Sequence, residues 1–333
     1  MASSVVRAFT DPDAYYAAHR TRRVEGFITE RGNFRAELTI IDFDRLWMER
    51  GEESLARVLN ITSDPERTKI LFPTSRSKPA THFDGLELSA REISVFRGPM
   101  DQHRSSASAA WGAMSLKRED LAAGSEAIIG RPLAASSLTH CIRPPQRVLT
   151  RLANLHEAAA HIAKNTPNVL AHPAVARAIE QGLIEVMVLC LATGDPVDTR
   201  SAHRHHRAVM QRLEDVLQVS SEEPLYMTEL CTAVGVSYPT LRACCQEHVG
   251  MSPKRYLWLR RMHLARRALR RATQETTTVT KIATNYGFWE LGRFSVAYRS
   301  LFGEPPSTTL RRPAEDRQPN EIFESPLEFA KSA

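Results

Sequence analysis

The sequence lacks the features that define several specialised classes of protein. Its 333 residues contain five cysteines, an odd number with no CxxC spacing, so neither a disulfide framework nor a cysteine zinc site is expected. The most apolar run, residues 183–192, holds Glu185 and is too short to cross a bilayer. The first residues lack the apolar segment of a secretory signal, and no GxxxxGK phosphate loop occurs. These absences favour a soluble cytoplasmic protein with no membrane partner.

Residue patterns for catalysis or metal binding are also sparse. A metal-dependent enzyme on a β-barrel would need several clustered histidines, but His82 and His103 each stand alone. His203, His205 and His206 lie in a polar stretch, residues 194–207, which we interpret as a linker because no cysteine or carboxylate pair near it in sequence completes a ligand set. We therefore expect no enzyme, no catalytic residue, no metal and no cofactor. Acidic pairs in expected turns are interpreted as structural: Asp11 with Asp13, and Asp42 with Asp44.

Positive charge is present, and it is unevenly distributed. The chain has 44 Lys and Arg against 38 Asp and Glu, a formal net charge of +6. Residues 206–312 alone carry a net +7, so the remainder is close to neutral. Within them, Pro253–Arg271 holds one Lys, seven Arg and no acid, and its apolar residues recur at helical spacing. Ser252 can cap this helix, whose length is about 28 Å. Such asymmetry is typical of a nucleic-acid-binding module attached to a neutral domain.

An internal repeat flanks the basic helix. Its copies are residues 229–253 and 281–306, about 52 residues apart. In each copy an apolar residue precedes a glycine by five positions, at Gly235 or Gly287, and a second glycine and a proline close the copy. A short helix, a glycine turn with positive φ and a second helix form a helix-turn-helix, whose second helix can enter a DNA major groove. The basic helix roughly matches the ~34 Å between successive major grooves.

The first part of the chain is expected to be rich in β-strands. Segments with β-forming residues and turn residues between them predict a small barrel or sandwich: 34–43, 56–61, 68–72, 86–96 and 111–116. Two apolar helices follow, at residues 146–165 and 171–193. The fold class is therefore α+β, with a β-rich domain at residues 1–200, an all-α domain with two helix-turn-helix motifs at residues 201–312, and a flexible tail at residues 313–333.

Two further sets of residues in the first domain allow two interpretations each. The helix at 146–165 carries a short heptad seam that either forms a dimer or packs on its own domain: Val148, Leu152, Leu155, Ala159 and Ile162. Aromatic side chains in the β-region either line an effector pocket or form plain core: Trp47, Phe72, Phe83, Phe96 and Trp111.

The repeat resembles the AraC/XylS family of bacterial transcription regulators. The carrying motifs are LCTAVGVSYPTLRACCQEHVGMSPKRYL and IATNYGFWELGRFSVAYRSLFGEPPS, and GFW with LGRF is most similar to the branch that includes the ethanolamine-operon activator. The resemblance implies a cytoplasmic regulator that often activates, with a β-rich, cupin-like sensing domain that is often dimeric. It implies double-stranded DNA, RNA polymerase and a small-molecule effector as partners. An effector-independent regulator, whose first domain only dimerises or binds a partner protein, is the alternative. Two residues depart from the family pattern: Cys245 replaces a core Phe and leaves a smaller core unless a neighbour such as Trp258 fills the space, and Ala243 replaces a base-reading Arg found in some members.

Residues off the apolar faces of the second helices are the candidate DNA contacts. Arg242 can bind guanine through two hydrogen bonds, Gln246 can pair with adenine, and Arg293 is the expected base reader of the second copy. Val296 offers a surface to a thymine methyl group. The other candidates either contact phosphate or flank the helices: Ser237, Tyr238, Thr240, Lys281, Trp289, Glu290 and Arg299. Some arginines of the basic helix are expected to face DNA, and the others to bridge the two helix-turn-helix units or to reach an acidic partner.

Overall fold

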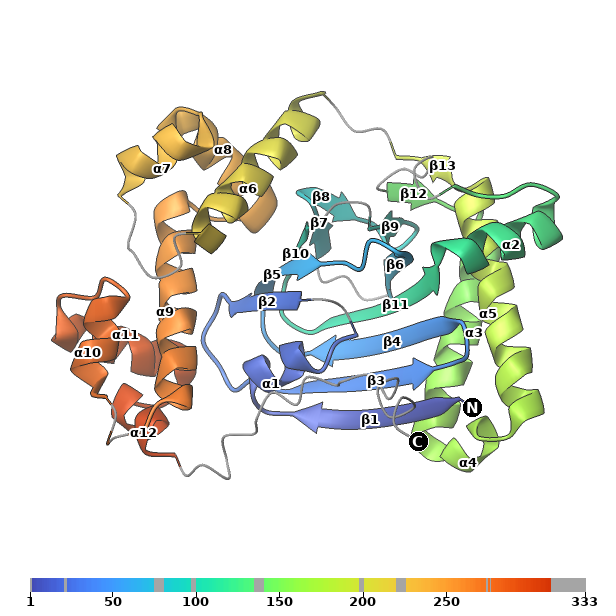
Figure 1. Cartoon of the computed structure of the whole chain (residues 1–333), viewed down its shortest axis with the longest axis horizontal. Helices are drawn as coiled ribbons and strands as arrows, with labels where there is room; N and C mark the ends of the chain where they lie inside the picture. Colours follow the sequence, from blue (N-terminus) through green and yellow to red (C-terminus); the bar gives the residue numbers. More distant parts are fainter. Residues whose placement is uncertain are drawn as a thin grey trace, which may run out of the picture.

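The computed structural model describes residues 2–20, 23–74, 81–96, 100–134, 141–197, 201–219, 226–273, 275 and 277–312. A β-rich region with covering helices comes first, and a purely helical region follows (Figure 1). This is the mixed fold class that the sequence predicts. The expected tail at 313–333 and a predicted turn at residues 98–99 lie outside the described residues.

Two antiparallel sheets build the first region. The larger has the strand order β1-β3-β4-β11-β6-β9-β12-β13, and the smaller has the order β2-β5-β10-β7-β8. The larger sheet contains β1 (Ser3–Phe9), β3 (Ala36–Asp42), β4 (Leu46–Glu53), β6 (Arg67–Pro73), β9 (Ile93–Val95), β11 (Ala109–Lys117), β12 (Cys141–Arg143) and β13 (Asp195–Pro196). The smaller contains β2 (Arg23–Ile28), β5 (Arg57–Thr62), β7 (Thr81–Phe83), β8 (Leu86–Leu88) and β10 (Asp101–Ser105).

Alternation along the strands gives the larger sheet two buried faces. On β6, Ile70 and Phe72 join a core shared with the helices, whereas Leu71 points into the core between the two sheets. The predicted segments at 34–43, 56–61, 68–72 and 111–116 are strands, and 86–96 is split into β8 and β9. The sequence analysis missed β4 and β10 because their buried faces carry charged and polar side chains instead of an apolar alternation.

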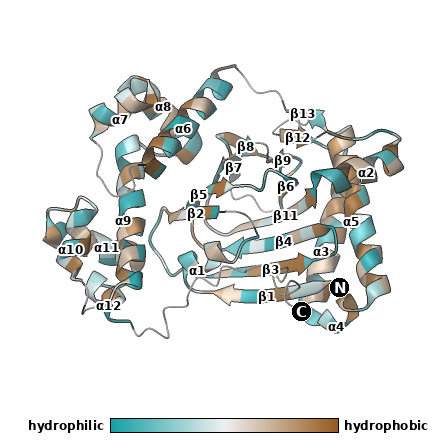
Figure 2. Ribbon diagram, in the orientation of Figure 1, coloured by the Kyte–Doolittle hydropathy of each residue, from teal (hydrophilic) through white to brown (hydrophobic). Residues whose placement is uncertain are grey.

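Helices cover the outer face of the larger sheet. They are α2 (Arg118–Ile129), α3 (Gln146–Asn165), α4 (Pro167–Leu170) and α5 (Pro173–Thr193), while α1 (Pro12–Ala17) lies beside β2. Much of α5 is coloured as hydrophobic (Figure 2). No helix in the described part of the chain is long and apolar enough to span a membrane.

The heptad seam of α3 is used inside the chain. Val148, Leu152 and Ala159 are buried in the core under the sheet, and Leu155 and Ile162 pack against the same core. These contacts favour the second interpretation of the seam, packing within its own domain, because Val148, Leu152 and Ala159 are covered by the core that α3 shares with α5 and the sheet.

The second region, in the residues that the structure describes, contains seven helices. They are α6 (Ser201–Val219), α7 (Met227–Val234), α8 (Tyr238–Val249), α9 (Pro253–Arg271), α10 (Val279–Asn285), α11 (Leu291–Phe302) and α12 (Pro306–Arg311). The basic helix is confirmed with the predicted bounds. The predicted linker at 194–207 is wrong from residue 201 onward, since α6 begins there. Histidines occupy the first turns of α6, so the apolar periodicity that predicts a helix is missing there.

Candidate nucleic-acid interface

The first helix-turn-helix consists of α7, a glycine turn and α8. Gly235 ends α7 with a φ of 74°, in the left-handed region that favours glycine. Ser237 caps α8, and its hydroxyl accepts a hydrogen bond from the backbone N–H of Thr240 at 3.4 Å. Cys245 lies in the core of this unit, where the sulfur of Met210 from α6 is 3.9 Å from its own sulfur. Met210 thus fills the space that a phenylalanine would take, and Trp258 packs on the other unit instead.

The outward face of α8 is open and polar. Arg242, Ala243 and Gln246 are exposed, and Tyr238 is 37% exposed. Together with Pro239 these side chains line a shallow surface hollow of about 390 Å³. The face therefore offers a guanidinium, an amide and a phenol to solvent on one helix, while Ser237 is exposed and Thr240 half-buried at its start.

The second helix-turn-helix consists of α10, a turn and α11. Thr278 caps α10 by accepting from the backbone N–H of Lys281 at 3.1 Å, and Gly287 has a φ of 75°. Phe294 and Tyr298 are buried against α9 in the core of this unit. The repeat thus builds the same local plan twice.

The outward face of α11 is also exposed. Trp289 is 72% exposed and Val296 is 71% exposed. Arg293 and Glu290 form an ion pair at 2.8 Å, but both side chains are mostly in solvent, so the pair holds the arginine weakly. The two remaining candidates of this unit, Lys281 and Arg299, are exposed as well.

Helix α9 joins the two units and forms part of both cores. Tyr256 packs with α6, α7 and α8, whereas Leu259, Met262 and Leu269 pack with α10 and α11. The units therefore lie toward opposite ends of one 19-residue helix (Figure 1).

Four of the seven arginines on α9 bind acids instead of facing solvent. Arg266 donates to Asp11 at 2.5 Å and to Asp13 at 2.6 Å, and Arg267 donates to Asp13 at 2.8 Å. Arg270 is also paired with Asp11. We call Asp11, Asp13 and their three arginine partners the acidic clamp, because it fastens the first domain to α9.

A second ionic contact lies further along α9. The guanidinium of Arg260 is 2.8 Å from Glu214 of α6 and 3.3 Å from Glu25 of β2, and all three side chains are buried. Tyr256 donates to the same Glu214 at 2.6 Å. The acidic pair at Asp11 and Asp13, which we interpreted only as structural, thus belongs to a larger contact between the two regions that sequence spacing could not reveal.

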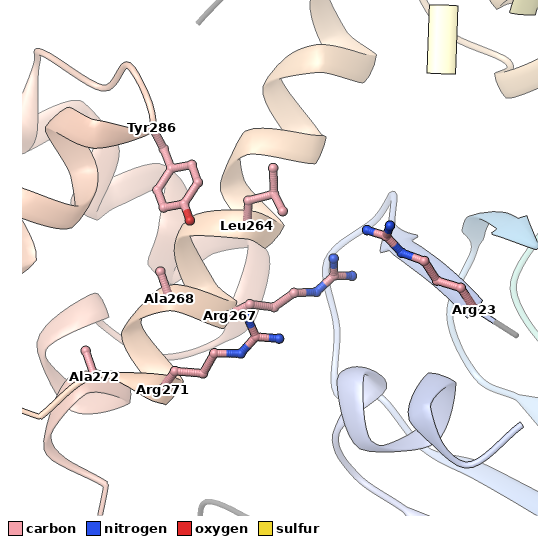
Figure 3. Close-up of a pocket in the computed structure, with 7 residues that line it drawn as sticks. All are labelled: Arg23, Leu264, Arg267, Ala268, Arg271, Ala272 and Tyr286. Atoms are coloured by element: carbon pink, nitrogen blue, oxygen red, sulfur yellow. The ribbon is translucent and has the colours of Figure 1, made fainter. Parts of the chain in front are cut away.

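Three of the four remaining cations of α9 are accessible, whereas Arg261 is half-buried, with its guanidinium 5.5 Å from the centre of the Phe288 ring. Lys254, Arg255 and Arg271 are exposed, and the Arg255 guanidinium lies 4.3 Å from the centre of the Trp258 ring. Arg271 borders an open groove of about 440 Å³ between α9, α10 and β2. The guanidinium groups of Arg23, Arg267 and Arg271 converge on this groove from the two regions (Figure 3). Lys254, Arg255 and Arg271 are therefore the exposed cations of the basic helix that an anion can reach.

The aromatic residues proposed to line an effector pocket do not share one site. Phe72 belongs to the core under the helices, whereas Phe83, Phe96 and Trp111 belong to the core between the sheets. Trp47 is half-buried, and the Arg67 guanidinium lies 3.6 Å from the centre of its ring. The strand alternation separates the five, because neighbouring strand positions face opposite sides of a sheet.

The space between the sheets contains a charged cluster that the sequence analysis missed. Glu53 accepts hydrogen bonds from Tyr15 at 3.0 Å, from Trp111 at 2.8 Å and from Arg57 at 2.5 Å. Arg57 also contacts His103 at 3.0 Å. Burial, and to a smaller extent the positive charge of Arg57, holds the pKa of His103 well below its usual value. The sequence signal that could have indicated this cluster is the group of acids Glu49, Glu52 and Glu53 within one strand.

A second buried ion pair lies near this cluster. Lys69 donates to Glu49 at 2.9 Å, and His19 lies 3.9 Å from the same carboxylate. Burial lowers the pKa of His19 to about 4, so this imidazole is neutral at pH 7. The interior of the first domain is therefore polar as well as aromatic.

Comparison with known proteins identifies the helical region. A family model described as a helix-turn-helix domain matches residues 230–312. The probable thc operon regulatory protein of Rhodococcus erythropolis is 38% identical over 97 residues, which cover 29% of this chain and 29% of that protein. The XylDLEGF operon transcriptional activator 3 of Pseudomonas putida is 36% identical over 104 residues, which cover 31% of this chain and 30% of that protein. The chain thus spans less than a third of the length of these relatives.

A solved structure is similar over a longer stretch and at lower identity. The AraC-like transcriptional activator CuxR is 17% identical, with 79% of this chain and 94% of that chain covered, at a TM-score of 0.41. The matched relatives are named as regulators of the thc and XylDLEGF operons, and the helix-turn-helix model, which spans residues 230–312, includes both helix-turn-helix units. Residues 230–312 therefore match a helix-turn-helix domain, the motif that both repeat copies predict.

Proposed function

We propose that this protein is a sequence-specific DNA-binding transcription regulator. The observation that carries the proposal is the pair of helix-turn-helix units at opposite ends of α9, each with an exposed polar face on its second helix. Helices α8 and α11 would enter successive major grooves on one side of the DNA. Arg242, Gln246 and Arg293 would read bases, and the exposed cations of α9 would contact phosphates.

The first domain would supply the input to this DNA-binding domain. The acidic clamp and the Glu25–Arg260 contact connect the first domain directly to α9, the helix that carries both helix-turn-helix units. A conformational change in the β-region that moved α1 or β2 would therefore also shift α9. We propose that a small-molecule effector produces this change, with the charged interior of the domain as the place where its polar groups would bind.

Other parts of the proposal rest on the family resemblance. A regulator of this kind would act in the bacterial cytoplasm, would activate transcription through RNA polymerase and would dimerise. With the α3 seam buried, a dimer would have to use another surface. The relatives matched here are named for the thc and XylDLEGF operons, so the ethanolamine-operon branch stays a prediction from the GFW and LGRF motifs alone.

DNA footprinting tests the central proposal. Full-length protein is mixed at low salt with the DNA upstream of its own gene, and two protected segments about one helical turn apart are expected. Arg242→Ala and Arg293→Ala should each relax base preference in one segment and cost about 1–3 kcal/mol of binding free energy. Arg177→Ala, an exposed arginine on α5, is the matched control. Folded protein that protects no DNA at low salt contradicts the proposal.

A thermal-shift screen separates the two forms of the proposal. An effector that binds only the folded β-region raises the melting temperature, whereas an effector-independent regulator shows no shift with any small metabolite. In the second case the first domain would serve dimerisation or a protein partner. Size-exclusion chromatography with light scattering then shows whether the chain is dimeric.

A further inference from the structure

Three histidines and a glutamate meet where α6 packs against α8. Nδ1 of His203 lies 2.6 Å from one carboxylate oxygen of Glu247, and Nδ1 of His206 lies 2.6 Å from the other. His203 and His206 stand three positions apart on α6, so one helix face presents both rings. The ring of His248 is stacked on that of His203, with centroids 5.7 Å apart and planes at 7°. Ligand atoms of His203, Glu247 and His248 all lie within 4.8 Å of one another.

His248 is the member of this cluster that hydrogen bonding does not explain. Its side chain is 1% exposed, and neither ring nitrogen has a hydrogen-bond partner among the residues that the structure describes. A buried imidazole without partners is costly, and such groups in native proteins commonly mark a water or an ion.

We propose that His203, Glu247 and His248, with His206 as the fourth member, bind a divalent transition-metal ion of the zinc type. Three imidazoles and one carboxylate suit zinc, which takes nitrogen ligands at about 2.0–2.1 Å and carboxylate oxygen at about 2.0–2.2 Å. Ligand atoms of such a tetrahedral site lie roughly 3.3–3.5 Å apart. The 2.6 Å contacts of Glu247 would therefore lengthen by under an ångström, while the ligand atoms of His203, Glu247 and His248, which lie within 4.8 Å of one another, would draw closer together. Because α6 and α8 are already packed against each other, rotation of these side chains alone can supply both movements.

The location gives the site a structural role. Glu247 and His248 end α8, where the helix dipole favours a cation. Gly85 of the β7–β8 turn lies directly against them, and a Cβ added there would be only 2.9 Å from the His248 ring. Beside it, Arg207 of α6 is paired with Asp84 of the same turn at 2.8 Å. A bound ion would join α6 to the C-terminal end of α8 at the point where both contact the first domain.

The competing explanation is that Glu247 merely holds two histidines by hydrogen bonds. That explanation accounts for His203 and His206, but it leaves both nitrogens of His248 unused. It also predicts no metal binding, so the two explanations differ in a direct measurement that does not depend on DNA binding.

Metal titration of the whole protein provides the test. Tag-free full-length protein is stripped with chelator, kept reduced and titrated with Zn²⁺ by calorimetry and with Co²⁺ by absorption spectroscopy. One equivalent should bind, the Co²⁺ complex should lack a thiolate charge-transfer band, and bound Zn²⁺ should raise the melting temperature. His206→Ala and His248→Ala should each weaken Zn²⁺ binding at least tenfold. His205→Ala is the matched control, because His205 is exposed on the same helix.

Each outcome decides the proposal. Stoichiometric binding that the His206 and His248 variants weaken and the His205 variant retains supports it. Failure of the unmodified protein to bind Zn²⁺ overturns it, as does a thiolate band, which would place the ion on one of the five cysteines. Binding that all three variants share equally also overturns it. Because His206 is only half-buried, its variant remains informative if His248→Ala does not fold.

Discussion

The acidic clamp predicts a measurable coupling between the first domain and α9. The perturbation is Asp13→Asn, which keeps the shape of the side chain and removes its charge. Asp13 accepts charge-assisted hydrogen bonds from Arg266 at 2.6 Å and from Arg267 at 2.8 Å. The variant leaves both guanidinium groups facing a neutral amide in a contact where the Arg266 side chain is only 8% exposed.

The expected loss is about 2 kcal/mol of unfolding free energy. Hydrogen bonds to charged groups contribute about 1.5–3 kcal/mol each, so two intact bonds set an upper range of roughly 3–6 kcal/mol. Asp13 is 20% exposed, which allows water to screen part of that interaction, and asparagine keeps one acceptor. Both effects lower the expected value toward about 2 kcal/mol. The coupling energy of Asp13→Asn with Arg267→Ala should then exceed ~1 kcal/mol in a double-mutant cycle.

The pH dependence gives the same prediction an independent readout. Burial alone would raise the pKa of Asp13, but the positive charges of Arg267 and Arg266 outweigh burial and hold that pKa below its usual value. The stabilisation is therefore complete above the unfolded-state pKa, about 3.9, and disappears as the pH falls through the lower folded-state pKa. Asp13→Asn should flatten the stability curve in this acidic range.

Urea unfolding followed by tryptophan fluorescence measures these quantities, since two of the four tryptophans lie in each region. Asp44→Asn, on an exposed acid of the first domain, is the matched control and should change stability little. The reasoning is refuted if the coupling energy is below about 0.5 kcal/mol or if Asp44→Asn destabilises the protein as much as Asp13→Asn does.

Three other predictions follow from separate parts of the molecule. Arg271→Ala, on the exposed end of α9, should weaken binding to all DNA sequences alike and reduce the salt dependence of log K by about 1, measured by fluorescence anisotropy; an unchanged slope contradicts its assignment to phosphate. Gly235→Ala should cost about 1–2 kcal/mol in thermal unfolding because φ is 74° there, and no loss would mean that the turn relaxes. Leu152→Ala should cost about 2–5 kcal/mol and leave the oligomeric state unchanged by light scattering, since the side chain is fully buried within the chain. A shift in oligomeric state would return the α3 seam to the dimer interpretation.

The candidate DNA-binding residues illustrate what local pattern reveals well. Gly235 and Ser237 act on backbone within three residues of themselves, so the turn and the cap could be predicted from spacing. The exposed face of α8 follows from helical geometry once Leu241 and Cys245 are assigned to the core. The strands β4 and β10 were missed for the opposite reason, because the buried polar side chains Glu53 and His103 have partners that are distant in sequence: Tyr15 and Trp111 for Glu53, and Arg57 for His103.

By itself the sequence determined the double helix-turn-helix, the basic helix between its copies and the mixed fold class, because these depend on periodicity, capping and turn residues that act within a few positions. Only the tertiary structure decided which arginines of α9 remain available to DNA, how the α3 seam is used, and that His203 meets His248. Pairings such as that of Arg266 with Asp11 join residues 255 positions apart in the sequence, and they depend on how the two domains pack. Whether an arginine is available to bind DNA depends on the folded surface around it. An acid that the fold places beside the arginine pairs with it and removes it from the DNA-binding surface.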